Sequence, residues 1–118
     1  MKNKTNPRIS NLIQELYKLS KKEGVALWKA LAKSLEKPSR NWAEINLDRL
    51  NEITEKGDKV VIPGKVLGSG KVDHKVEVYS FNATKNAKKQ IIKAEGSCLD
   101  IEELMKKNPQ AKGVKIIK

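Results

Sequence analysis

The sequence predicts an α/β protein in which N-terminal helices precede irregular, repeated turns of strand, strand and helix. Two observations predict this class. Apolar residues recur at helical spacing through residues 1–40, and from Trp42 onward short segments of period two alternate with short helical segments. Because no linker separates parts of the 118 residues, we expect one compact domain with a basic helical part, residues 1–40, and a mixed part, residues 41–118.

The N-terminal part predicts two helices. Asn6 is placed to cap the first, with Pro7 at its first position, and Gly24 ends it. Its apolar face consists of Ile9, Leu12, Ile13, Leu16 and Leu19. Pro38 stops the second helix. The apolar side of that helix consists of Leu27, Trp28, Leu31 and Leu35.

The middle of the chain predicts strands around one short helix. Residues 42–47 alternate as a half-buried strand, and the apolar spacing that follows suits a helix over residues 47–53. Val60–Ile62 is a β-branched run typical of an interior strand, and we expect the Pro-Gly pair after it to end that strand. Residues 64–71 then predict a loop rich in glycine and lysine, which leads into an alternating strand over residues 76–81.

The last third continues the alternation of helix and strand. Asn82 is placed to cap a helix that Gly96 ends. A brief strand, a helix with Asp100 and Glu103 at capping-box spacing, and a final strand over residues 114–117 follow. The order of the strands within a sheet does not follow from the sequence.

The charge of the chain is strongly basic and is segregated along the sequence. Lys and Arg number 25 against 14 Asp and Glu, a formal net charge of +11. Residues 1–40 hold ten basic and three acidic groups, residues 59–94 hold eight and two, and the segment between them is acidic. Uniform enrichment for solubility would not leave an acidic stretch between two basic blocks. The pattern therefore favours one surface that meets a polyanion, with nucleic acid as the first candidate.

Several classes of protein are disfavoured by what the sequence lacks. It has no hydrophobic run of secretory or transmembrane length and no lipidation signature, so we expect a cytoplasmic protein without a membrane partner. Cys98 is the single cysteine, which rules out an intrachain disulfide and a four-thiolate zinc site.

Lysines recur every four residues along the predicted helix that follows Asn82. Lys85, Lys89 and Lys93 share one face, with Lys88 between them. Like charges at this spacing weaken a helix by about 0.2 to 0.5 kcal/mol per pair. Phosphates of an RNA helix would relieve that repulsion, which favours a binding role for the group, although a solvated face is the alternative.

The predicted loop over residues 64–71 is a second candidate for phosphate contact. Its glycines allow close approach of a backbone to a phosphate, while Lys65 and Lys71 supply charge. A plain tight turn is the alternative. A nucleotide-binding P-loop is disfavoured because five residues separate the first glycine from the Gly-Lys pair and Val72 follows Lys71.

No group of residues predicts catalysis. His74 stands alone in a polar stretch and is expected in a surface loop, and Cys98 is expected as a core thiol. We therefore predict no enzymatic activity, no cofactor, no metal site and no small-molecule substrate. Trp28 is expected in the core, whereas Trp42 is expected to be partly exposed, with stacking on RNA as a minority alternative.

The segments together resemble the archaeal and eukaryotic eighteen-e family of large-subunit ribosomal proteins, which is related in fold to bacterial large-subunit protein fifteen. The resemblance covers essentially the whole chain. It rests on residues 4–7, Trp28, residues 35–40, residues 62–70, Ser80, Phe81, Ala83, Ala87, residues 101–104, Asn108, Pro109 and residues 113–117. The chain departs from the family at Ala94–Gly96, where a second glycine is common, and at Gln110–Lys112, where the turn is longer. The absence of long extensions favours an archaeal source.

The resemblance implies a non-catalytic α/β protein that binds large-subunit ribosomal RNA beside neighbouring ribosomal proteins, and so supports subunit assembly and translation. The RNA contacts that it implies are Lys4, Thr5, Arg8, Lys37, Ser39, Arg40, Lys65, Ser69 and Lys71. A free-standing nucleic-acid binder shares the charge pattern and is the main alternative. A phosphate-processing enzyme that uses the glycine loop is the third class.

Overall fold

Five parallel strands form one sheet in the computed structural model, which describes residues 6–117. Their order is β1-β2-β3-β4, and β5 pairs with β2 as well. The strands are β1 (Ala43–Asn46), β2 (Asp58–Leu67), β3 (Val76–Ala83), β4 (Ser97–Asp100) and β5 (Val114–Ile116). The α/β class predicted from the sequence is confirmed.

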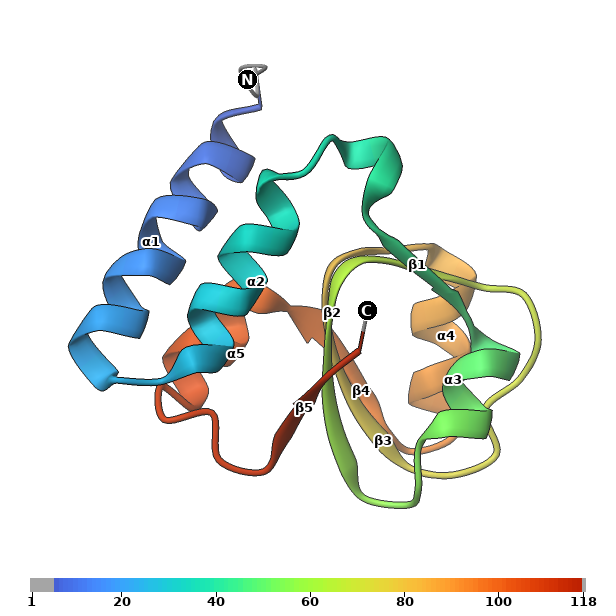
Figure 1. Ribbon diagram of the computed structural model, residues 1–118. Coiled ribbons are helices and arrows are strands. Elements are labelled where there is room, and N and C mark those ends of the chain that lie inside the picture. Colours follow the sequence, from blue (N-terminus) through green and yellow to red (C-terminus); the bar gives the residue numbers. More distant parts are fainter. Residues whose placement is uncertain (1–5, 118) are drawn as a thin grey trace.

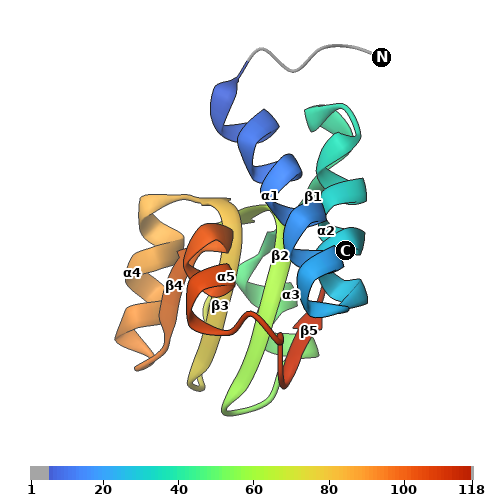
Figure 2. The same ribbon diagram turned by 90° about the vertical axis from the view of Figure 1, so that its left-hand side faces the viewer.

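Helices cover both faces of the sheet. The helices are α1 (Pro7–Glu23), α2 (Ala26–Glu36), α3 (Leu47–Ile53), α4 (Lys85–Lys93) and α5 (Ile101–Lys107), and a short 3-10 helix, η1 (Ser39–Asn41), precedes β1. Figure 1 shows α1, α2 and α5 on one side of the sheet and α3 and α4 on the other. Figure 2 looks onto the side of α1 and α5, with the strands behind them. The molecule therefore has three layers.

Residues that alternate along β2 and β3 build the core on each side of the sheet. Val61 of β2 and Tyr79 and Phe81 of β3 pack with α1, α2 and α5, while Val60 and Ile62 face α3 and α4. The side chain of Trp28, a residue of α2, is fully buried as predicted, and its indole Nε1 donates to the carbonyl of Pro109 at 2.8 Å. Strands buried on both faces read as continuous apolar runs, which is the pattern of Val60–Ile62.

The prediction that Pro63 and Gly64 end a strand is wrong, because β2 continues to Leu67. The register with β3 shifts between Ile62 and Lys65, and β2 changes its other neighbour from β5 to β1 across the same point. Proline lacks a backbone donor and is tolerated at such an irregularity. A Cβ on Gly64 would lie 1.9 Å from the carbonyl oxygen of Ala43, so glycine is required for β1 to approach.

Other predicted helix ends are wrong in detail. Thr84, and not Asn82, caps α4 by accepting from the amide of Ala87, and Asp100 makes no side-chain cap bond at α5. Gly96 lies beyond α4, where a Cβ would stand 2.2 Å from the carbonyl oxygen of Val76. At α1, by contrast, Asn6 caps the helix as predicted.

In two turns a residue other than glycine adopts the left-handed backbone conformation that favours glycine. Glu95 has φ 68° and Ala111 has φ 54°, and they are the non-glycine residues with positive φ in the described chain. Both lie in the two segments where we expect the sequence to depart from the family that it resembles. Each of these turns therefore carries backbone strain, because left-handed φ is costly for residues that carry a Cβ.

An ion pair joins the two ends of the fold. Arg8 of α1 donates from Nε and Nη2 to the carboxylate of Glu102 in α5, at 2.9 and 3.0 Å, and lies 3.8 Å from Asp100. The guanidinium also stacks over the ring of Phe81, with its central carbon 3.9 Å from the ring centroid. The hydrogen bond from Arg8 lowers the pKa of Glu102, and the same bond raises the pKa of Arg8.

We predict that Gly64→Ala destabilises the protein by about 1 to 3 kcal/mol or more, because its methyl group must push β1 away from β2. Urea denaturation followed by circular dichroism measures this change. Lys65→Ala, the exposed neighbour on the same strand, should leave stability unchanged within about 0.5 kcal/mol. Equal midpoints for Gly64→Ala and the parent chain would contradict the close approach.

We predict that Glu102→Gln lowers the free energy of unfolding at neutral pH by about 1 kcal/mol, because it removes the charge that Arg8 faces. The pKa of Glu102 is lower in the folded state, so its stabilisation is present above its ordinary value of 4.5 and is lost as pH falls through the folded pKa. The difference between parent and variant should therefore shrink below that pH. Glu15→Gln, which alters an exposed pair with Lys18, is the control and should show neither effect.

Candidate nucleic-acid interface

Three of the predicted RNA contacts lie around one hollow at the edge of the sheet. Ser39 and Arg40 of η1 and Lys65 of β2 line a hollow of about 420 Å³. Its remaining lining residues are Ile9, Trp42, Ala43, Glu44, Gly64, Phe81 and Asn82. The hollow forms where the end of β2 and the end of β3 meet the start of β1, which lie together at the top of Figure 1. Residues distant in sequence therefore converge on one exposed edge.

Two aromatic rings stand in contact in this hollow. The rings of Trp42 and Phe81 lie edge to face, with centroids 5.0 Å apart and planes at 73°. The indole Nε1 of Trp42 donates to the carbonyl of Lys37 at 3.0 Å. Trp42 is half-buried, which agrees with the expected partial exposure, whereas Phe81 is buried. The orientation of the Trp42 ring is thus held from two sides while part of it reaches the surface.

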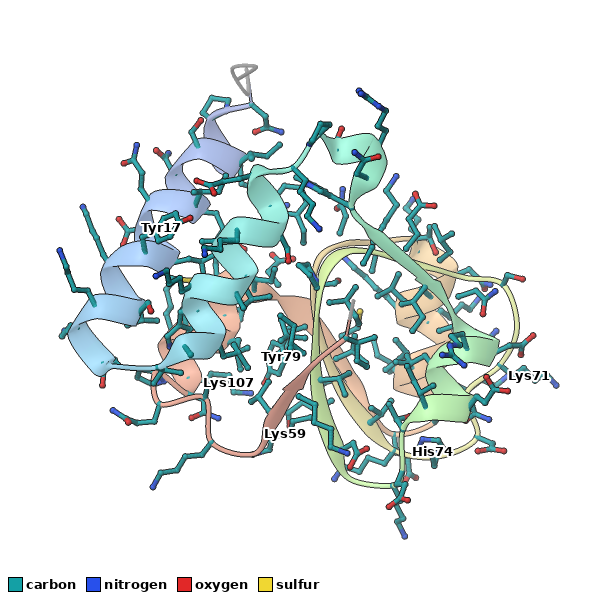
Figure 3. The ribbon with its side chains drawn as sticks, in the orientation of Figure 1. Tyr17, Lys59, Lys71, His74, Tyr79 and Lys107 are labelled. Atoms are coloured by element: carbon teal, nitrogen blue, oxygen red, sulfur yellow. The ribbon has the colours of Figure 1, made fainter. Side chains whose placement is uncertain are left out.

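The loop that follows β2 is shorter than predicted, and several of its backbone groups are bound by α3. The carbonyl of Ser69 accepts from the amide of Leu47, and the amide of Lys71 donates to the Asp48 carboxylate at 3.1 Å. A Cβ on Gly70, at φ 94°, would stand 2.2 Å from that carboxylate, so the glycine serves an intramolecular contact. Figure 3 shows the side chain of Lys71 directed away from the body. The amide of Lys71 is therefore engaged within the protein, whereas the Lys71 side chain is exposed.

Helix α4 presents its lysines to solvent. Ala87 and Ile91 are buried, while Lys85, Lys88, Lys89 and Lys93 are exposed. Within residues 6–117 none of these four lysines forms an ion pair, and α4 itself contains no acidic residue. Asn86 of the same helix donates to the carbonyl of Gly68 at 2.7 Å, which joins the start of α4 to the loop after β2.

The remaining predicted contacts have different surroundings. Arg8 is occupied by Glu102 and Phe81, so its RNA contact stays a prediction that competes with an intramolecular pair. Lys37 is exposed at the end of α2, beside a smaller hollow that Trp42 also lines. Lys4 and Thr5 lie outside the described residues.

The described residues show no arrangement suited to catalysis. His74 is more enclosed than the surface histidine we expected, because its ring is held between Thr54 and Asp73 at 2.8 and 3.0 Å. Burial raises the pKa of the Cys98 thiol, which makes it a poor nucleophile. Among residues 6–117 no cluster of metal-ligating side chains occurs. In that same part of the chain no helix combines the length and apolarity needed to span a bilayer.

Sequence reasoning missed part of the hollow. Sequence patterns predict no binding role for Glu44 or Asn82, and they predict Asn82 as a helix cap. The alternating apolar pattern places Glu44 on a strand, but nothing in the sequence indicates that Glu44 lies close to Asn82, 38 positions later. That contact depends on the parallel pairing of β1 with β2 and of β2 with β3, where Lys65 stands opposite both Glu44 and Asn82.

Comparison with known proteins identifies relatives across almost the whole chain. Residues 26–99 match the model of the family described as ribosomal proteins 50S-L15, 50S-L18e and 60S-L27A. The large ribosomal subunit protein eL18 of Methanoregula boonei is 43% identical over 98% of this chain and 95% of its own length. The proteins of the same name from Methanothermobacter thermautotrophicus and Methanosphaerula palustris are 42% and 38% identical, over 97% and 98% of this chain and 94% and 95% of their own lengths.

These relatives come from methanogens, which agrees with the prediction that the sequence is of archaeal type. The matched family is one of ribosomal proteins, a structural and non-enzymatic class, which agrees with the prediction that the chain is not an enzyme. The extent and identity of these matches show that this chain belongs to the family of ribosomal proteins 50S-L15, 50S-L18e and 60S-L27A.

Proposed function

We propose that this protein is a structural constituent of the large ribosomal subunit in the cytoplasm, where it binds ribosomal RNA and neighbouring subunit proteins. Family membership supports the assignment. The observation that carries RNA binding is the basic face of α4, where four exposed lysines have no acidic partner among the described residues. A cationic helix face without counter-charges of its own is suited to a polyanion.

The proposed mode of binding is contact with phosphates along a continuous path. The path runs from the hollow beside η1 and β2, across the loop that Asn86 attaches to α4, and along the lysines of that helix. Contacts of this kind fix the position and orientation of a protein on RNA without reading sequence. The proposed contact residues are Lys4, Thr5, Arg8, Lys37, Ser39, Arg40, Lys65, Ser69, Lys71, Lys85, Lys88, Lys89 and Lys93.

We predict that the tagged protein co-sediments with the large subunit in a density gradient and remains there after a wash at moderate salt. A free-standing nucleic-acid binder would instead distribute over many RNAs and stay near the top of the gradient. Known large-subunit proteins in the same gradient provide the control. Failure of the protein to sediment at low salt, while those proteins do, would remove the assignment.

We predict a steep salt dependence for binding to a large-subunit RNA fragment, with a log-log slope on the order of −3 to −6 if about five to seven phosphates are neutralised. Replacement of Lys85, Lys88, Lys89 and Lys93 by alanine should reduce the magnitude of that slope by about 2 to 3. Filter binding over a range of salt measures it.

The matched control removes the same charge elsewhere. Alanine replacement of Lys18, Lys22, Lys106 and Lys107, which lie on α1 and α5, should leave the slope unchanged. Equal slopes for the two quadruple variants would show that net charge, and not the face of α4, drives binding.

A further inference from the structure

One large hydrophobic side chain is exposed in the part of the chain that the structure describes. It belongs to Ile92 of α4, which is 62% exposed. The apolar face of the same helix, Ala87 and Ile91, is fully buried against the sheet, so Ile92 is not part of the core. Isolated apolar residues are common on protein surfaces, and exposure by itself therefore indicates no function. The position of Ile92 on the helix is what distinguishes it.

Ile92 lies among the lysines of α4. Residues three and four positions apart are neighbours on a helix surface, which places Lys88 and Lys89 next to Ile92. Since each residue turns the helix by about 100°, the four lysines span an arc of about 140°, and Ile92 lies within that arc. Figure 2 shows α4 at the margin of the molecule, and its inner side packs on β2, β3 and β4. The outer face of α4 therefore combines one apolar side chain with the cations around it.

The shape of this face suits a regular array of phosphates. From Lys85 to Lys93 the lysines extend over about 12 Å of one helix, at about 1.5 Å per residue. Such a straight, rigid row matches the fixed spacing of phosphates in a duplex. Sites for single strands use aromatic rings on which bases stack, and α4 contains no aromatic residue. The face of α4 is therefore suited to a double-stranded nucleic acid.

We propose that α4 binds the minor groove of double-stranded RNA, with Ile92 packed against riboses between the phosphates that the lysines contact. The proposal rests on the function proposed above and names the form of RNA that this face recognises. An A-form RNA helix has a deep, narrow major groove that side chains cannot read, and a wide, shallow minor groove lined by the 2′-hydroxyl edges of the riboses. The carbon atoms of those sugars offer an aliphatic side chain a surface for packing.

The same arrangement distinguishes RNA from DNA. The minor groove of B-form DNA is about 6 Å wide, whereas a helix with its side chains measures about 10 to 12 Å across. Helix α4 therefore cannot lie in that groove. The lysines can attract either duplex through its phosphates, but the contact of Ile92 with riboses across a shallow groove requires RNA.

The experiment measures binding of the full chain to a labelled RNA duplex of mixed sequence, by fluorescence anisotropy over a range of salt. A length of about 16 base pairs presents two successive minor grooves. A DNA duplex of the same sequence and one strand of the RNA are the comparison probes. We expect the RNA duplex to bind about 5- to 10-fold tighter than either of them at moderate salt.

Ile92→Ala should weaken binding to the RNA duplex by about 3- to 10-fold at every salt concentration, because the contact that it removes is apolar. The log-log slope against salt should stay that of the parent chain, since no phosphate contact is lost. An unchanged slope also shows that the lysines of α4 keep their arrangement. Binding to the DNA duplex and to the single strand should change by less than about 2-fold.

Two further variants test whether the contact is apolar. Ile92→Leu keeps an aliphatic side chain of the same volume and should bind the RNA duplex within about 2-fold of the parent chain. Ile92→Gln, which is neutral but polar, should lose as much affinity as Ile92→Ala. Gln90→Ala is the matched control, because Gln90 lies about 160° from Ile92 around the axis of α4, outside the arc of lysines, and it should change nothing.

The outcomes distinguish this proposal from the one it rests on. If Ile92→Ala binds the RNA duplex as the parent chain does, or weakens all three probes equally, the minor-groove contact is overturned even where steep salt dependence and co-sedimentation uphold the ribosomal function. A single strand that binds tighter than the duplex has the same consequence. Unchanged duplex binding by Ile92→Ala, together with weaker co-sedimentation, would place Ile92 against a neighbouring protein and would also overturn the proposal.

Discussion

The burial of β2 on both faces is the constraint on which the rest of the structure depends. Val61 faces the layer of α1, α2 and α5, while Val60 and Ile62 face α3 and α4, so one strand anchors both cores. The same strand pairs with β3 along one edge and with β5 and then β1 along the other. Its irregularity at Pro63 and Gly64 is the point where these partners change, and it sets the end of β2 beside Trp42.

The acidic side chains explain how a chain of such positive charge stays compact. Many of them make bonds within the protein. Glu102 binds Arg8, Asp48 accepts from the amide of Lys71, and Asp58 accepts from the amide of Glu55 and lies 3.4 Å from Lys115. These contacts tie loops and termini to the sheet, and they leave the lysines of α4 without partners in the described structure. The carboxylates therefore bind groups within the protein, and the lysines of α4 face solvent.

The proposed RNA contacts differ in the charge of their surroundings. The lysines of α4 suit phosphates, which report the shape of RNA but not its sequence. Glu44 stands opposite Lys65 in the pairing of β1 and β2, so a negative group lies beside a positive one in the hollow that these two residues line.

The sequence by itself determined the class of the fold, most of its elements and the basic character of its surface. Periodicity suffices for these because burial of one face of a helix or strand imposes a local pattern, as in Leu12 and Leu16 of α1 or Val76 and Val78 of β3. The segregation of charge can likewise be seen in the sequence, where an acidic segment separates two basic ones. The path of β2 through Pro63 and Gly64, the pairing of Arg8 with Glu102 and the hollow that joins Glu44 to Asn82 were decided only in three dimensions. Each depends on which strands or helices become neighbours, and that is decided by long-range packing and not by any local property of the residues involved.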